Sequence, residues 1–329
     1  MPINRDRAQA TPELGVVIPC FDEEAVLGAL FAELTRFAER APGKVWFLLV
    51  DDGSRDATSR LIDEQCGKDP RFAALHFSRN FGHQTAVSAG LAHVRGDVVA
   101  VLDADLQDPP DVVLRMIDTW REGFDVVYGV RRNRKEGAVL RTCYAAFYRV
   151  MRRVANVEIP LDAGDFSLMD RKVVDLVNSM PEHNRFVRGL RGWVGFRQTG
   201  LEYDRAARAA GEAKYGFRKL FRLALDGLVS FSSLPLRLAA WLGLIAAALG
   251  FVLMLWALVA ALFAEKTPPG WASTAVIVLF FGGVQLLMLG VLGEYLGRIY
   301  DEVKGRPHFV IAARSGWVDD AFRVDANRA

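Results

Sequence analysis

The sequence predicts an α/β domain with a mainly parallel β-sheet, followed by an amphipathic helix at a membrane surface and a hairpin of two transmembrane helices. In the amino-terminal half, short apolar runs alternate with amphipathic stretches, which is typical of a parallel sheet covered by helices. A polar cluster follows several of these runs, at the point where a strand would end. Near the carboxyl terminus, two runs of about 27 residues contain no charged side chain, and each is long enough to cross a membrane as a helix.

Hydrophobic periodicity gives the expected elements of the α/β domain. Strands are predicted at residues 14–18, 45–50, 73–77, 98–102 and 126–128, and helices at residues 24–39, 57–66, 84–94 and 111–122. Further along, the weaker pattern predicts a helix over residues 139–155 and a strand over residues 165–169. Residues 217–236 combine apolar and basic side chains and are expected to form the interfacial helix, although an ordinary helix packed on the core would have the same pattern.

The two uncharged runs cover residues 238–264 and 267–293, and only Glu265 and Lys266 separate them. We expect membrane-spanning helices at residues 238–264 and 271–293, because each can cross a hydrocarbon layer of about 30 Å. Two buried helices of a soluble domain are the alternative. Such helices rarely avoid charge for more than about 18 residues, which favours the membrane hairpin.

Basic side chains flank this hairpin on both sides and predict its orientation. Arg218, Lys219, Arg222 and Arg237 precede it, and Arg298, Lys304, Arg306 and Arg314 follow it, whereas the connecting loop has only Lys266. Residues 1–13 lack the apolar stretch of a secretory signal. We therefore expect a multi-pass protein of the cytoplasmic (inner) membrane, with the large domain and both termini in the cytoplasm.

Overall composition says less about partners. The formal net charge of +2 does not identify one, and no nucleic-acid partner is expected. Basic residues gathered near the apolar runs instead suit membrane lipids or phosphates. Cys20, Cys66 and Cys143 are an odd number without metal-ligand spacing, which is typical of unpaired thiols in a reducing compartment.

The strongest local signal is the segment from Asp103 to Asp108, which reads Asp-Ala-Asp-Leu-Gln-Asp directly after an apolar strand. Two carboxylates separated by one residue at a strand end can direct oxygen ligands towards one divalent cation, and Mg²⁺ or Mn²⁺ fits. Such an ion would bridge the two phosphates of a nucleotide-sugar and neutralise the departing diphosphate. A solvated acidic loop would have the same spacing, so the spacing alone does not identify a metal site. The other motifs of the chain favour the metal site.

A second acidic pair, Asp51 and Asp52, follows another buried strand and precedes Gly53. Ser54 or Asp56 could cap the next helix, but capping does not explain why Asp51 and Asp52 are both acidic. Asp52 is therefore expected to bind the base or ribose of a nucleotide. After the first strand, Phe21 could line a base pocket, although a single aromatic residue could equally be part of the core.

Four motifs in this order resemble the inverting glycosyltransferases with a GT-A fold. They are Val-Ile-Pro-Cys-Phe-Asp-Glu-Glu from Val17, Val-Asp-Asp-Gly-Ser from Val50, Ser-Arg-Asn-Phe-Gly-His from Ser78, and Asp-Ala-Asp-Leu-Gln-Asp-Pro-Pro from Asp103. The chain is most similar to the polyisoprenyl-phosphate glycosyltransferases, such as dolichol-phosphate mannosyltransferase and bacterial bactoprenol glucosyltransferase. The segments 162–166 and 185–196 and the terminal hairpin also match, so the resemblance covers residues 14–310.

The resemblance implies a set of functional residues. Nucleotide contacts fall on Pro19, Phe21, Glu23 and Asp52, donor contacts on Asp103 and Ala104, and metal contacts on Asp103, Asp105 and Gln107. Asp165 would lie beside the reacting centre, as a base or a positioning group. Arg131, Arg205, Arg208 and Lys214 would contact the phosphates of donor and acceptor, although a simple basic flank of the hairpin would also contain the last three. Ala213 replaces a serine that is frequent in the family, which removes any hydroxyl contact there.

The expected organisation is a flexible amino terminus (residues 1–13), a GT-A domain (14–216), the interfacial helix (217–236), the hairpin (237–295) and a cytoplasmic tail (296–329). The expected activity is metal-dependent transfer from a nucleotide-sugar, by default a UDP-sugar, to a polyprenyl phosphate such as undecaprenyl phosphate. A homo-oligomer formed through the hairpin is left open.

Three other functions are weighed against this one. A processive polysaccharide synthase would share the acidic motifs, but Gln-x-x-Arg-Trp is absent and two membrane helices are few for a polymer channel. A dinucleotide-dependent oxidoreductase is disfavoured because no G-x-G-x-x-G follows the first strand. A membrane-tethered subunit that binds nucleotide-sugar without catalysis has little need for both the acidic turn and Asp165.

Overall fold

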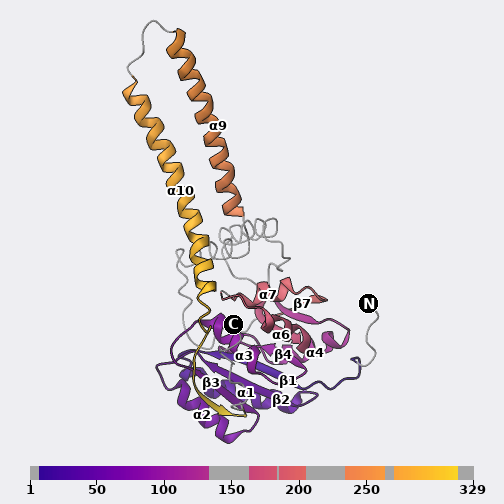
Figure 1. The fold of residues 1–329 in the computed structure, drawn as a ribbon. Helices are drawn as coiled ribbons and strands as arrows, with labels where there is room; N and C mark the ends of the chain where they lie inside the picture. The colour runs from indigo at the N-terminus through magenta and orange to yellow at the C-terminus, as the bar shows by residue number, and fades with distance from the viewer. Residues whose placement is uncertain (1–6, 133–162, 184, 205–233, 264–269, 318–329) are drawn as a thin grey trace. The chain divides into compact units, whose positions relative to one another are not determined.

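The computed structural model describes residues 7–132, 163–183, 185–204, 234–263 and 270–317 (Figure 1). Contacts divide the chain into two compact units. One consists of Met1–Ala145, Val157–Lys214 and Arg306–Ala329, and the other of Ala146–Asn156 and Tyr215–Gly305. The expected helix over residues 139–155 and most of the expected interfacial helix lie outside the described residues.

The first unit is built on an eight-stranded sheet with the order β7-β5-β6-β4-β1-β2-β3-β8. β1 is parallel to β2 and β4, β2 to β3, and β5 to β7, whereas β6 and β8 are antiparallel to their neighbours. The strands are β1 (Leu14–Cys20), β2 (Val45–Asp51), β3 (Phe72–Phe77), β4 (Val98–Val101), β5 (Val126–Arg131), β6 (Ala163–Asp170), β7 (Gln198–Tyr203) and β8 (Ile311–Gly316). This confirms the predicted α/β domain with a mostly parallel sheet.

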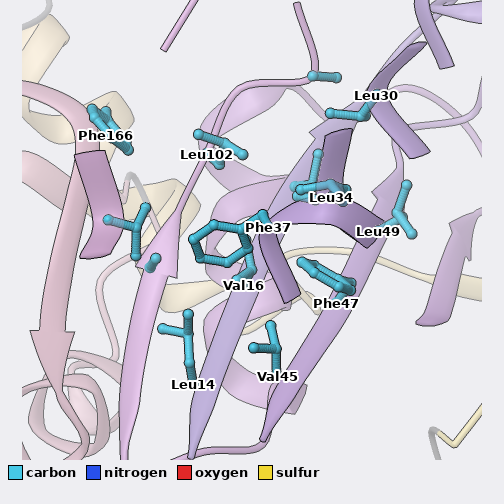
Figure 2. Packing of buried hydrophobic residues seen from close by; sticks show 14 of the residues in the cluster. Leu14, Val16, Leu30, Leu34, Phe37, Val45, Phe47, Leu49, Leu102 and Phe166 are labelled. Carbon is cyan, nitrogen blue, oxygen red and sulfur yellow. The ribbon is translucent and has the colours of Figure 1, made fainter. Parts of the chain in front are cut away.

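Helices cover both faces of this sheet, and each face has its own apolar core. Side chains alternate along β1, so Val16 joins one core and Val17 the other. The helices are α1 (Glu24–Arg40), α2 (Thr58–Lys68) and α4 (Asp111–Arg121) on the first core, and α3 (His83–His93), α6 (Arg171–Ser179) and α7 (Val187–Trp193) on the second. Figure 2 shows Phe37 of α1 beside Val16 in the first core. Since β1 has helices on both faces, all seven of its residues are buried.

Helix α3 approaches β1 closely because Gly90 has no side chain. A Cβ atom at Gly90 would lie 2.1 Å from Cγ1 of Val17, so only glycine lets the helix pack at this distance. The helix begins at His83, just after the carboxyl end of β3. Its first turn therefore lies at the edge of the sheet where the parallel strands end.

Strand β8 follows the apolar hairpin in the sequence and was not predicted. Residues 296–329 were expected to form a tail, but Ile311–Gly316 pairs antiparallel with β3, with Ile311 opposite Phe77. The ring of Phe309 stacks on Phe77 at 5.2 Å, and the Trp317 indole N–H donates to the carbonyl of Arg71. The chain that returns from the hairpin thus enters the sheet at the carboxyl end of β3.

The second unit contains α9 (Leu234–Phe263) and α10 (Trp271–Val303), which pack against each other as an antiparallel pair (Figure 1). Gly243 faces Met288 and Gly250 faces Phe281, so partners move in opposite directions along the two helices. Helix α9 begins inside the expected interfacial segment, and α10 continues beyond the expected end at residue 293 to Val303.

Among the described residues of these two helices, one segment, Phe280–Val303, is long and apolar enough to cross a membrane, and Leu238–Leu253 forms a shorter apolar stretch. The helical hairpin is therefore present, while its two crossings of a membrane stay a prediction.

Candidate active site

The polar clusters predicted at the strand ends meet at one edge of the sheet. Cys20 at the end of β1 is in register with Asp51 at the end of β2, and Asp51 is in register with His76 of β3. On the other side of β1, the Leu102 N–H that follows β4 donates to the carbonyl of Val17. The segments after β1, β2, β3 and β4 therefore lie side by side, as expected for a ligand site of a parallel sheet.

The loops after β1 and β2 are joined by hydrogen bonds between side chains and backbone. The Asp22 N–H donates to Ser54 Oγ at 3.0 Å, and the Arg55 N–H donates to the Asp22 carboxylate at 2.8 Å. Gly53, which directly precedes Ser54, has φ +71°, and a Cβ there would lie 2.5 Å from the backbone of Arg79. Only glycine fits this turn.

Asp52 is buried, and its carboxylate holds the loop before α3. Its oxygens accept hydrogen bonds from the N–H groups of Phe81 and Gly82 at 2.6 and 2.9 Å. Burial raises the pKa of Asp52 in spite of these two bonds. The carboxylate thus has a structural task, and its predicted contact with a nucleotide would use the remaining lone pairs.

The other predicted nucleotide residues lie at the end of β1 and just before α1. Phe21 is 41% exposed, which excludes the alternative that it is a core residue. Glu23 is half-buried at the start of α1, and Pro19 is buried within β1. Asp56, and not Ser54, accepts the N–H of Thr58 at the start of α2.

A hydrogen-bond chain that is buried at Asp51 and His76 joins β2, β3, α2 and β8. His76 Nδ1 lies 3.0 Å from the Asp51 carboxylate, and His76 Nε2 lies 3.0 Å from the Asp63 carboxylate. Ser315 of β8 donates to Asp63 at 2.5 Å, and Asp51 also accepts the N–H of Ser54. The chain therefore connects the strand after the hairpin with the turn that contains Asp52 and Gly53.

Two members of this chain, Asp51 and His76, have shifted pKa values. Burial acts to raise the pKa of Asp51, but hydrogen bonds from His76, Ser54 and Ser59 outweigh it and lower the pKa to about 2. Burial acts to lower the pKa of His76, but Asp51 and Asp63 outweigh it and raise the pKa above its usual value. Stability from Asp51 is present above the unfolded pKa of 3.8 and is lost as pH falls through about 2. Stability from His76 is present below the unfolded pKa of 6.5 and is lost as pH rises through the folded pKa.

Replacing His76 with glutamine is expected to lower the free energy of unfolding by about 1–3 kcal/mol at pH 6, because the buried Asp51 and the half-exposed Asp63 lose a charged donor. The difference between wild type and variant should shrink as pH rises above the folded pKa of His76. Thermal unfolding of both proteins between pH 5 and 9 measures it. A constant difference in Tm over this range would contradict a charged His76.

The acidic turn after β4 combines carboxylates with an unsatisfied amide. The Gln107 N–H donates to the Asp105 carboxylate at 3.1 Å, and Leu106 between them has φ +56°, which is uncommon for a residue other than glycine. Gln107 is 8% exposed, and no hydrogen-bond partner of its Oε1 is present among the described residues. A buried amide oxygen without a donor costs free energy unless a ligand supplies one.

Asp103 in the same turn is surrounded by other acids. Burial is the main reason that its pKa rises to about 6, and the charges of Asp108, Asp165 and Asp105 raise it further. These like charges repel one another, and a bound cation would relieve the repulsion. No group of three or more His, Cys, Asp or Glu side chains in the described part of the chain is arranged to hold a metal. The carboxylates of Asp103 and Asp105 and the amide oxygen of Gln107 are of the donor type that Mg²⁺ or Mn²⁺ prefers.

The side chain of Asp165 in β6 is 7% exposed and receives hydrogen bonds from three side chains. Arg188 of α7 donates through two nitrogens at 2.7 and 2.9 Å, and Gln84 donates at 3.0 Å. His83 Nε2 lies 3.4 Å from Asp165 and 3.8 Å from Asp103, so it connects Asp165 with the acidic turn. Burial acts to raise the pKa of Asp165, but Arg188 and His83 outweigh it and hold the pKa far below its usual range.

Sequence reasoning assigned no individual role to His83, Gln84 or Arg188. His83 and Arg188 lie in two segments that match the family, and this match was the only indication in the sequence that they belong to the site. Their importance follows from the pairing of Arg188 with Asp165, which are 23 positions apart. A pairing between residues so far apart in the sequence depends on the packing of α7 against β6, and no local sequence pattern predicts it.

The remaining predicted residues are divided between the site and the undescribed segments. Arg131 ends β5 and donates to the hydroxyl of Tyr203 at 3.5 Å, while this hydroxyl donates to Asp108. Ala104 is buried in the core beneath the acidic turn. Arg205, Arg208 and Lys214 lie outside the described residues.

Comparison with known proteins gives two matching families. Residues 15–177 match the family described as "Glycosyl transferase family 2", and residues 234–299 match the "GtrB C-terminal hairpin". The "Uncharacterized glycosyltransferase YkcC" of Bacillus subtilis is 44% identical over 305 residues, which are 92% of this chain and 94% of that protein. The "Bactoprenol glucosyl transferase" of Shigella phage SfII is 40% identical over 300 residues, with 91% and 97% covered.

Among solved structures, similarity is found to "Mannosyltransferase PcManGT from Pyrobaculum calidifontis in complex with GDP-Man and Mn2+". It is 17% identical, covers 88% of each chain and has a TM-score of 0.48.

Proposed function

Because the chain belongs to glycosyltransferase family 2 and carries a GtrB-type hairpin, we propose that it glycosylates a polyprenyl phosphate at the cytoplasmic face of a membrane. The donor is a nucleotide-sugar, and the product is a polyprenyl-phosphate-sugar. A UDP-sugar and undecaprenyl phosphate are the substrates we assign. Relatives named bactoprenol glucosyl transferase, similar over nearly their whole length, support a glucosyl group and a bactoprenol-type lipid.

The observation that carries the proposal is the meeting of the acidic turn with Asp165 at one edge of the sheet. His83 contacts Asp103 and Asp165, so the groups for a diphosphate and for a reacting sugar carbon are neighbours. Asp103, Asp105 and Gln107 would hold the divalent ion. When bound, the ion would neutralise charge on the leaving diphosphate. Phe21, Glu23 and Asp52 at the same edge are our candidates for the nucleoside.

Transfer with inversion needs one bond to form and one to break. An oxygen of the lipid phosphate forms a bond to the anomeric carbon as the bond from that carbon to the diphosphate breaks. The electron pair of the broken bond leaves with the nucleoside diphosphate. A phosphate monoester has a second pKa near 6, so the acceptor is largely a dianion at neutral pH and has no proton to lose.

Asp165 therefore acts as a positioning and charge-stabilising group. Its low pKa makes it a weak base, and hydrogen bonds from Arg188 and Gln84 fix both of its oxygens. A fixed carboxylate can stabilise the positive charge that develops on the sugar ring as the bond to the leaving group breaks.

Two features support membrane insertion of the α9–α10 hairpin. Both helices expose large apolar side chains, such as Trp241, Trp256 and Leu286 at 63%, 68% and 71%, which is a costly surface in water. In addition, β3 precedes the hairpin and β8 follows it, and the two strands pair in one sheet. A chain that leaves and re-enters the same domain has to cross the membrane an even number of times, which fits two spans.

The acceptor phosphate must lie at headgroup depth while its polyprenyl chain stays in the bilayer, and we assign Arg205 and Arg208 to it. Replacing both with alanine is expected to raise the KM for lipid phosphate about 10-fold, because a charge-assisted hydrogen bond is lost. The KM for nucleotide-sugar should change much less. Arg36→Ala, which removes an exposed arginine paired with Glu33 on α1, is the matched control. Equal effects on both KM values would instead place these arginines on the donor.

The substrates are tested by incubating membranes that contain the protein with a panel of radiolabelled nucleotide-sugars, followed by lipid extraction and mass analysis. One nucleotide-sugar should label a polyprenyl phosphate, and membranes without the protein should remain unlabelled. Label in a water-insoluble polymer would indicate a processive synthase. Binding of a nucleotide-sugar without any turnover would indicate a non-catalytic subunit.

A further inference from the structure

Arg191 of α7 is the most deeply buried cation in the described part of the chain, at 2% exposure. Its guanidinium makes one long hydrogen bond of 3.5 Å, to the carbonyl of Gly164, and lies 5.5 Å from the ring centre of Tyr128. It forms no ion pair with any described residue. A guanidinium has five N–H donors, so the described residues use little of its hydrogen-bonding capacity.

Two other arginines of the same domain differ in this respect. Arg185 donates to Ser88 Oγ and to the carbonyls of Met180 and Val177 at 3.2, 2.6 and 2.7 Å. Arg171 donates to two carbonyls at 2.8 and 3.0 Å. These two side chains are less buried than Arg191 and better satisfied. A structural role explains them, whereas Arg191 keeps a buried charge without the bonds that normally accompany one.

The position of Arg191 relates it to the site. Gly164, its hydrogen-bond acceptor, directly precedes Asp165 in β6. Arg188, one helical turn before Arg191, already neutralises Asp165 with two hydrogen bonds. Arg191 therefore adds a positive charge beyond the one on Arg188 that already pairs with Asp165. Burial lowers the pKa of Arg191 to about 10, so the side chain remains charged at neutral pH.

We propose that Arg191 is a positioning residue whose buried charge helps to hold a phosphate group beside Asp165. The Asp103 side of the site gathers carboxylates and suits a cation, while Arg188 and Arg191 give the Asp165 side an excess of positive charge. Charges act strongly where little water separates them, so Arg191 stabilises an anion without touching it. This inference rests on the proposed function, because it deepens how that site binds its phosphate substrates.

The test compares Arg191→Gln, which removes the charge, with Arg191→Lys, which keeps it. Arg191→Gln is expected to raise the KM for a phosphate substrate about 10-fold, and Arg191→Lys by less than about 3-fold. Separate titrations of polyprenyl phosphate and nucleotide-sugar identify whether the phosphate is that of the acceptor or that of the donor. If Arg191→Gln does not fold, Arg191→Met is the second uncharged variant, because it keeps the apolar stem.

Arg185→Gln is the control for a purely structural loss. It should lower Tm and leave both KM values unchanged, because all of the contacts of Arg185 are within the fold. The inference is overturned if folded Arg191→Gln behaves in the same way, or if Arg191→Lys raises KM as much as Arg191→Gln. Failure of the wild type to glycosylate any polyprenyl phosphate would instead contradict the proposed function.

Discussion

Replacing Asp105 with asparagine is expected to reduce sugar transfer at least about 100-fold, because the divalent ion loses a charged ligand and the leaving diphosphate loses stabilisation. The fold should persist. The Asp105 carboxylate accepts the N–H of Gln107, and the amide oxygen of asparagine can accept the same bond. Initial rates at saturating substrates, with Tm as the check on folding, measure the effect.

The matched control is Asp118→Asn, which changes an acid on α4 that is 70% exposed and paired with Arg121. Its activity should equal that of the wild type. A strong chelator should also abolish wild-type transfer, and Mg²⁺ or Mn²⁺ should restore it. Full turnover in the chelator would contradict the role assigned to Asp103, Asp105 and Gln107.

Replacing Asp165 with asparagine is expected to reduce transfer about 100-fold or more, by a factor that stays nearly constant above the phosphate pKa near 6. The variant loses the negative charge beside the sugar and leaves Arg188 without its carboxylate. The acceptor is already a dianion at these pH values, so a missing base would not matter. Rates of variant and wild type at pH 6 to 9 measure the ratio.

A general base predicts a different profile for the same variant. Activity would be lost mainly at low pH and would recover substantially where the acceptor is a dianion. Because Arg188, which is 32% exposed, then loses a charged acceptor, Tm should also fall by a few degrees. Asp97→Asn changes an acid near the opposite edge of the sheet and controls for general effects of the substitution. Wild-type turnover of Asp165→Asn at every pH would exclude Asp165 from the site.

Local sequence patterns predicted the central strands and the turns that follow them. β1, β2 and β4 are apolar runs that end in acidic or glycine-containing turns, and a parallel sheet brings such turns together. The expected α/β fold of GT-A type and the family resemblance agree with the match to glycosyltransferase family 2. The positions of these turns in the sheet could therefore be predicted from hydrophobic periodicity and from the order of the strands along the chain.

Long-range pairings were missed because no local pattern encodes them. β8 reads Ile-Ala-Ala-Arg-Ser-Gly, a short segment without alternation, and it becomes a strand through its pairing with β3. The partners of Asp165 come from α3 and α7, so Arg188 and Gln84 could be assigned only after both helices were placed. Asp52 was expected to bind a ligand, but its carboxylate also holds the loop before α3, and no sequence pattern indicated this structural role.

The mass of the lipid product made by purified protein tests whether this chain transfers one sugar to a polyprenyl phosphate. The protein is incubated with UDP-glucose, undecaprenyl phosphate and Mg²⁺, and lipid and nucleotide products are quantified together. We predict a lipid that gains one hexose, with one UDP released for each lipid phosphate consumed. Free glucose, several sugars on each lipid, or lipid that stays unchanged with UDP-glucose and with each other nucleotide-sugar of the same panel would contradict the proposed function.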